Sequence, residues 1–133
     1  MKKALLSILA VVAISGTAIA GGNYKLDVKA PSAKANEKAT VKVHLEGTGG
    51  FHVNTEYPTK LTINAPAGVT LDKATQTKGD AVKFGKDGAD FAVGFTSSDA
   101  GKKSFTGTFK FATCTDENCA PQTAQLAFDV DVK

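Results

Sequence analysis

The sequence predicts an all-β protein, an immunoglobulin-like antiparallel β-sandwich of seven to nine strands. Apolar and polar residues alternate with a period of two through most of the chain after residue 20. Turns rich in glycine separate these runs, and no segment after residue 20 has the apolar spacing of an amphipathic helix. Many short strands in a chain of about this length are typical of such a sandwich, and a small barrel is the alternative.

Each expected strand has one apolar and one polar face, as half-buried antiparallel strands require. The alternating runs are residues 24–28, 41–45, 61–63, 69–71, 91–95, 105–111 and 126–132. Turn signals at residues 47–50, 65–68, 86–88 and 99–101 lie between these runs. Residues 30–38 are expected to be an ordinary connection between strands.

Residues 1–20 are expected to be a secretory signal peptide. Lys2 and Lys3 precede an apolar run at residues 4–14, which is too short to span a bilayer as a helix. Small residues at 18 and 20 form an A-x-A cleavage signal, so we expect cleavage after Ala20. The processed protein would be periplasmic, with secretion as the alternative, and would not stay inserted in the membrane.

Residues 21–133 are expected to form a single domain, because about 110 residues suffice for one core and no linker interrupts them. Removal of Lys2 and Lys3 lowers the net charge from +3 to +1. A net charge this small does not attract nucleic acid or acidic lipid over long distances, and the chain has no arginine for bidentate phosphate binding. We therefore expect no nucleic-acid partner, and we expect a monomer.

The two cysteines of the chain, Cys114 and Cys119, flank a four-residue turn between two expected strands. Residues that face each other across antiparallel strands have Cα atoms about 4.5–5.5 Å apart, within the range of a disulfide. An exported chain also meets an oxidising compartment, so a disulfide is expected. The bridge is either redox-active or structural, and the residues alone favour neither.

Two further observations bear on that choice. A bridge that closes six residues stabilises a fold by only about 2 kcal/mol, whereas the tip of a hairpin is accessible to an attacking thiolate. Asp116 and Glu117 lie between the cysteines, and negative neighbours disfavour a thiolate. These charges favour a pair that passes electrons on as a reductant over a strong oxidant, and they are equally compatible with an inert bridge.

The residues around the cysteines resemble a known family. The pattern is an aromatic strand followed by Cys114, Asp116, Cys119 and Pro121, with the upstream stretch Gly-Phe-His-Val-Asn at residues 50–54. It is similar to the N-terminal periplasmic, immunoglobulin-like domain of the thiol:disulfide interchange protein DsbD. The resemblance covers about residues 40–130, but Gln122 stands where that family often has a second proline or an aromatic residue.

The resemblance implies roles for individual residues. Cys114 and Cys119 would be the exchanging pair, and the resemblance leaves either of them as the one that attacks first. Phe84 would be the aromatic shield of a cap loop over the disulfide, although Val82 and Phe84 also fit an ordinary core pair. Asp116, Pro121 and His52 would support the hairpin site.

The implied function is thiol–disulfide exchange in the periplasm, in which electrons pass through the cysteine pair to client proteins. A thioredoxin-like or membrane electron donor would be a separate partner, because the chain contains no C-x-x-C motif. No cofactor is expected. The alternative is a non-enzymatic binding or assembly module with a purely structural disulfide.

Metal binding and hydrolysis have little support. His44 lies on the polar face of its expected strand, where a histidine is usually solvated, and a copper or zinc site would need His44, His52 and a reduced cysteine together. No such spacing is present, so no metal site is predicted. The chain has no G-x-S-x-G motif for a serine nucleophile and no phosphate-binding glycine loop.

Overall fold

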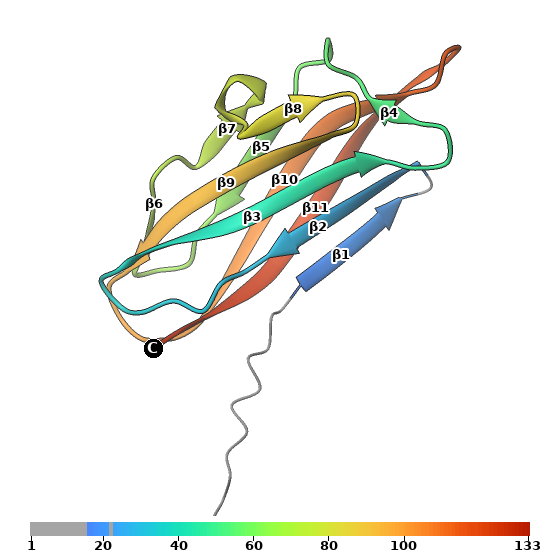
Figure 1. Ribbon diagram of the computed structural model, residues 1–133. Helices are drawn as coiled ribbons and strands as arrows, with labels where there is room; N and C mark the ends of the chain where they lie inside the picture. The colour runs from blue at the N-terminus through green and yellow to red at the C-terminus, as the bar shows by residue number, and fades with distance from the viewer. Residues whose placement is uncertain (1–15, 22) are drawn as a thin grey trace, which may run out of the picture.

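The computed structural model describes residues 16–21 and 23–133, which form two antiparallel sheets packed face to face (Figure 1). The predicted immunoglobulin-like β-sandwich is confirmed. The described residues contain eleven strands, because β1 and the short strands β4, β7 and β8, of two or three residues each, add to the seven predicted runs. No helix in this part of the chain is long and apolar enough to cross a membrane.

The first sheet has the order β1-β2-β3-β9-β6, and β8 also pairs with β9. Its strands are β1 (Gly16–Gly21), β2 (Tyr24–Lys29), β3 (Lys38–Gly47), β6 (Val69–Leu71), β8 (Lys83–Gly85) and β9 (Gly88–Ser97).

The second sheet has the order β11-β10-β5-β7, and β4 also pairs with β10. Its strands are β4 (His52–Val53), β5 (Lys60–Asn64), β7 (Thr75–Thr77), β10 (Gly101–Cys114) and β11 (Cys119–Val132). A single 3-10 turn, η1 (Lys78–Asp80), follows β7. The two sheets share no strand in the described chain, so they do not close as a small barrel would.

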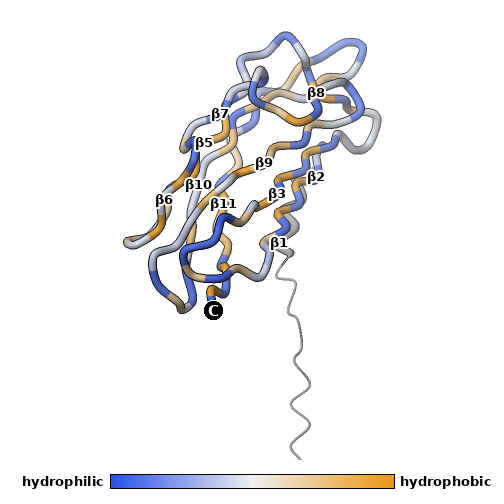
Figure 2. The backbone as a smooth tube through the Cα atoms, turned by 60° about the vertical axis from the view of Figure 1, so that its left-hand side comes forward, coloured by the Kyte–Doolittle hydropathy of each residue, from blue (hydrophilic) through white to orange (hydrophobic). Residues whose placement is uncertain are grey.

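The core follows from the period-two pattern. In β2 the buried positions are Tyr24, Leu26 and Val28, and the alternation of hydrophobic and hydrophilic residues is visible along the strands in Figure 2. Aromatic side chains join the two sheets, with ring centroids 5.4 Å apart for Phe91 and Phe109 and 5.2 Å apart for Phe95 and Phe105. These contacts fix the second sheet, and with it the cysteine hairpin, against the first.

The predicted connection at residues 30–38 also holds the far end of β11. The N–H of Ala33 donates to the carbonyl of Asp131 over 3.1 Å, and the N–H of Ala35 donates to the carbonyl of Lys133 over 2.8 Å. The segment therefore joins β2 and β3 of the first sheet and also contacts the second sheet, at the end of the hairpin opposite the cysteines (Figure 1).

The predicted signal peptide lies largely outside the described residues. Its basic start and apolar run at residues 4–14 belong to the part that is not described, whereas residues 16–20 lie in β1. Strand β1 pairs with β2 from Gly16 opposite Lys29 to Gly21 opposite Tyr24. Cleavage after Ala20 would therefore remove most of one edge strand, and it stays a prediction.

Candidate functional site

The two cysteines close the longest hairpin of the fold. Strands β10 and β11 pair along their whole length, and their last register pair is Cys114 opposite Cys119. The predicted disulfide is confirmed: the two residues are joined by an S–S bond, and their Cα atoms lie 4.0 Å apart. Directly opposed residues of antiparallel strands carry their side chains on one face, which brings the two sulfurs together.

Hydrogen bonds within the turn hold the hairpin tip. The N–H of Thr115 donates to the carbonyl of Asn118 over 2.7 Å. The hydroxyl of Thr115 accepts from the N–H groups of Glu117 and Asn118 at 3.3 and 3.1 Å, as threonine commonly does in turns. The four-residue turn therefore keeps the cysteines in register through its own bonds.

The two cysteines differ in exposure. Cys114 is 4% exposed, whereas Cys119 is exposed at the start of the edge strand β11. The difference arises from β4, which pairs with the other side of β10 and places His52 opposite Cys114. An incoming thiolate can therefore reach the Cys119 sulfur more readily than the Cys114 sulfur.

The segment around β4 forms the wall of a hollow beside the disulfide. The N–H of Asn54 donates to the carbonyl of Ala112 over 2.9 Å, and its side-chain amide lies 3.7 Å from the Cys119 sulfur. The N–H of Val53 donates to the carbonyl of Lys86, in the turn between β8 and β9. The hollow has a volume of about 360 Å³ and is open to solvent.

Both signs of charge surround this hollow. Lys86 and Glu56 line it together with the cysteines, and His52 lies on the same wall. Asp116 and Glu117 are exposed at the hairpin tip. The sulfurs therefore face a polar, accessible surface with one lysine and three carboxylates nearby.

The structure brings together some of the predicted site residues and not others. His52 lines the hollow, and Asp116 lies in the turn that joins the cysteines. Pro121 is exposed on β11 opposite Ala112, at an edge strand where proline costs no ladder bond. The role of these residues in exchange stays a prediction.

Phe84 lies in β8, half-buried and packed against the hydrophobic core. The nearby residue that lines the hollow is Lys86, two positions later. Val82 is 72% exposed, so the expected core pair of Val82 and Phe84 is wrong for Val82. Shielding of the disulfide by Phe84 stays a prediction.

Sequence reasoning named Asn54 and Lys86 only as parts of larger stretches. Both contribute to the site through backbone pairing between segments distant in the chain, β4 with β10 and β4 with the β8–β9 turn. The signal that could have identified Asn54 is its place in the Gly-Phe-His-Val-Asn stretch at residues 50–54. The position of Lys86 depends on tertiary contacts that leave no local pattern.

The histidines do not form a shared site. The Nδ1 of His44 lies 2.5 Å from an Asp90 carboxylate oxygen on the outer side of the first sheet, so His44 has an acidic neighbour in addition to solvent. Among the described residues, no three His, Cys, Asp or Glu side chains are grouped so that they could hold a metal ion.

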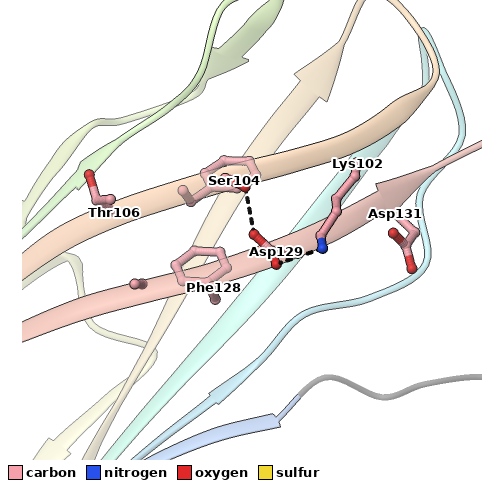
Figure 3. A pocket seen from close by; sticks show the side chains of 8 residues that line it. Lys102, Ser104, Thr106, Phe128, Asp129 and Asp131 are labelled. Atoms are coloured by element: carbon pink, nitrogen blue, oxygen red, sulfur yellow. Dashed lines mark hydrogen bonds and ion pairs between the residues drawn. The ribbon is translucent and has the colours of Figure 1, made fainter.

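A larger hollow, of about 580 Å³, lies at the other end of the hairpin (Figure 3). There Ser104 donates to Asp129 over 2.7 Å, and Lys102 lies 3.4 Å from the same carboxylate. The Ser104 hydrogen bond and then the charge of Lys102 hold the pKa of Asp129 below its ordinary value. These side chains bind one another, and the lining includes neither a cysteine nor a histidine that could activate Ser104, so the cysteine hairpin is the stronger candidate.

Comparison with known proteins gives a fold and no family. The sequence matches no known family, and it matches no curated protein. The GAE domain of GGA2p from Saccharomyces cerevisiae has a similar structure, with a TM-score of 0.54 and 12% identity over 86% of this chain and 97% of that one. This likeness supports the β-sandwich fold alone.

Two further solved structures are similar at lower scores. The N-terminal periplasmic domain of ScsB from Proteus mirabilis has a TM-score of 0.48 and 9% identity, over 87% of this chain and 50% of that one. Domains 4 and 5 of the S-layer protein SbsC have a TM-score of 0.46 and 13% identity, over 88% of this chain and 53% of that one. This chain spans about half the length of each of these two structures.

Proposed function

We propose that this protein is a thiol–disulfide exchange domain that acts outside the cytoplasm, in the periplasm, and passes electrons through Cys114 and Cys119. The observation that carries the proposal is the difference between the two sulfurs: Cys119 is exposed at a hairpin tip, while Cys114 is buried next to β4. The pattern of residues around the cysteines, which resembles the DsbD N-terminal domain, adds to it.

The proposed reaction has two halves. A thiolate of a donor dithiol, thioredoxin-like or in the membrane, attacks the Cys119 sulfur, and Cys114 leaves as a thiolate that takes a proton from water. The second donor thiolate then attacks the donor sulfur of this mixed disulfide and releases Cys119, so the donor is oxidised by two electrons and the pair is reduced.

The second half reverses this chemistry on a client disulfide. The Cys119 thiolate attacks the client bridge, and Cys114 then attacks Cys119, which re-forms the Cys114–Cys119 bond and leaves a client dithiol. The carboxylates of Asp116 and Glu117 disfavour an accumulated thiolate, which suits a reductant. Activity in this sense depends on a separate electron donor.

The alternative is a binding or assembly module in which the bridge is structural. The reduction potential of the Cys114–Cys119 pair distinguishes the exchange function from this alternative. It is measured by equilibrating a protein of residues 21–133 in defined thiol buffers. We expect a value above roughly −250 mV, among exchanging couples; a value below roughly −300 mV would mark a structural bridge and overturn the proposal.

Two single variants test which of the two sulfurs a partner reaches first. In Cys114→Ser the remaining Cys119 thiol should react with a maleimide reagent at least about tenfold faster than the remaining Cys114 thiol in Cys119→Ser, because access limits the attack. Equal rates, or a faster Cys114, would contradict the assignment of Cys119 as the sulfur that partners reach first.

A further inference from the structure

Two lysines lie directly opposite each other on the outer face of the second sheet. Lys110 of β10 pairs with Lys60 of β5, and both side chains are exposed. Directly opposed side chains on one face have Cβ atoms about 4.5–5.5 Å apart, and like charges in this arrangement destabilise a sheet. The pair therefore costs stability wherever nothing neutralises it.

Within residues 16–21 and 23–133, no carboxylate forms an ion pair with either lysine. Five lysines of the described chain form ion pairs with carboxylates, such as Lys38 with Asp72 and Lys73 with Asp80 at 2.7 Å, whereas Lys60 and Lys110 are among the lysines that form none there. Asp80, which binds the backbone N–H of Thr77 at the end of the same row, is already held by Lys73. Two positive charges thus stand together without a counter-charge.

Threonine hydroxyls surround the lysines. In the next row Thr108 lies opposite Thr62, and in the lysine row Thr77 flanks Lys60 while Thr123 flanks Lys110. Lys60, Thr62, Thr108 and Lys110 line a hollow of about 220 Å³. Thr108 donates a long 3.4 Å bond to Gln125, which a closer acceptor would replace.

We propose that this hollow binds a tetrahedral oxyanion, phosphate or sulfate, either free or as an ester on a larger molecule. Two ammonium groups match the charge of a dianion, and two hydroxyls offer further donors to its oxygen atoms. A bound dianion would also remove the repulsion between Lys60 and Lys110. The chemistry selects oxyanions over chloride, which has one charge and no set of separate oxygens.

The site is separate from the proposed exchange reaction. Lys110 lies four residues before Cys114 on β10, which places it roughly 13 Å from the disulfide along the strand. Anion binding needs neither cysteine in a particular redox state. Loss of one activity by mutation would therefore leave the other to be measured.

The structure provides a matched control pair. Lys29 and Lys42 also lie opposite each other, on the first sheet, but the partner of Lys42 on its other side is Ala92, and Asp90 lines the adjacent hollow. The replacement of both lysines there removes the same charge from a pair that has one threonine, Thr40, two positions away on the same face, and not two threonines opposite each other. It leaves the Lys60–Lys110 hollow unchanged.

The test is an amide NMR titration of the protein with sodium phosphate, sodium sulfate and sodium chloride at matched ionic strength. We expect saturable amide shifts at residues 60–62 and 108–110 with phosphate and with sulfate. The affinity obtained from these shifts should be at least about tenfold lower in K60Q/K110Q and unchanged in K29Q/K42Q. Equal shifts in chloride, or equal losses in both double variants, would overturn the proposal.

A second arm with glycerol phosphate distinguishes the sources of the anion. Tighter binding of the ester than of inorganic phosphate supports a site for a phosphorylated molecule, and equal binding supports a site for the free anion. Because Lys60 and Lys110 are exposed, their replacement should leave the protein folded, and thermal unfolding without added anion checks this. Failure of both phosphate forms to bind would overturn the proposal.

Discussion

The burial of one sulfur and the exposure of the other arise from the register of β4. His52 lies opposite Cys114 on one side of β10, while Cys119 lies on the other side in the edge strand β11. A residue-by-residue reading of the sequence predicts that the cysteines pair, since they flank a short turn. It cannot predict which one β4 covers, because that pairing joins residues about sixty positions apart.

Thr113 has a buried hydroxyl beside this site. It is fully buried, and its hydroxyl has no hydrogen-bond partner in the described chain. Thr113→Val should raise the free energy of unfolding by about 1 kcal/mol, because an unpaired buried hydroxyl costs stability that a methyl group does not. Urea unfolding measures the difference.

Thr59 supplies the matched control for that substitution. It is also buried, at 3% exposed, but its hydroxyl donates to the carbonyl of Tyr57 over 3.2 Å. Thr59→Val should therefore lower the free energy of unfolding by about 1 kcal/mol. If both variants change stability in the same direction, the unpaired state of the Thr113 hydroxyl is not what determines its effect.

Asp80 should make stability depend on pH in the acid range. Its hydrogen bond from Lys73, followed by that from the backbone N–H of Thr77, holds the pKa of Asp80 below its ordinary value. A carboxyl with a lowered folded-state pKa stabilises the fold above its unfolded pKa, about 3.9, and this stabilisation is lost as pH falls through the folded pKa.

Asp80→Asn should therefore lower the urea midpoint at about pH 7, and this loss should become smaller toward about pH 2, as the wild-type carboxyl takes up its proton. Asp116→Asn removes the same charge at the exposed hairpin tip and serves as the control. A loss of equal size at both pH values would show that the ionised carboxylate does not cause the effect.

Strand β10 joins three other strands to the site, and it needs a glycine to do so. Gly107 pairs with Ile63 of β5, and a Cβ atom there would lie 2.6 Å from the carbonyl oxygen of Thr62. Gly107→Ala should destabilise the fold by about 1–3 kcal/mol through this clash. Gly85→Ala, where a Cβ would meet nothing within 4 Å, should have no such cost.

Urea unfolding of the two glycine variants checks this difference. Equal stability of Gly107→Ala and Gly85→Ala would mean that β5 and β10 can move apart without loss. The sequence shows Gly107 only as a break in the alternation of β10, because the close approach of β5 is a tertiary feature. The long strands were predictable from their period, and so was the short β6, in which Val69 and Leu71 flank Thr70, whereas β4 and β8 show no such alternation.

The complete sandwich should fold without the disulfide. The bridge closes a loop of six residues, which stabilises a fold by about 2 kcal/mol, whereas the inter-sheet core and the hairpin ladder are formed by the rest of the chain. Cys114→Ser/Cys119→Ser should therefore stay folded, with a free energy of unfolding lower by about that amount. Far-UV circular dichroism with urea titration measures both quantities.

Loss of the β-sheet spectrum at 25 °C in the double variant would contradict this prediction. A decrease much larger than the loop-closure value would point to the bridge as a structural staple, in agreement with the alternative function. Phe109 and Phe111, both buried in the strand that ends at Cys114, hold that strand on the core whether or not the bond is present.

The ladder of β10 and β11, each fourteen residues long, ends at the sulfur pair and is fixed at its other end by residues 33–35. Opening a bond at the last rung of such a ladder leaves every other rung in place. The oxidised and reduced proteins should therefore have almost the same outline and differ in a patch a few atoms wide. A partner that distinguishes the reduced protein from the oxidised one must therefore contact the sulfur atoms themselves, because the rest of the surface is the same in both states.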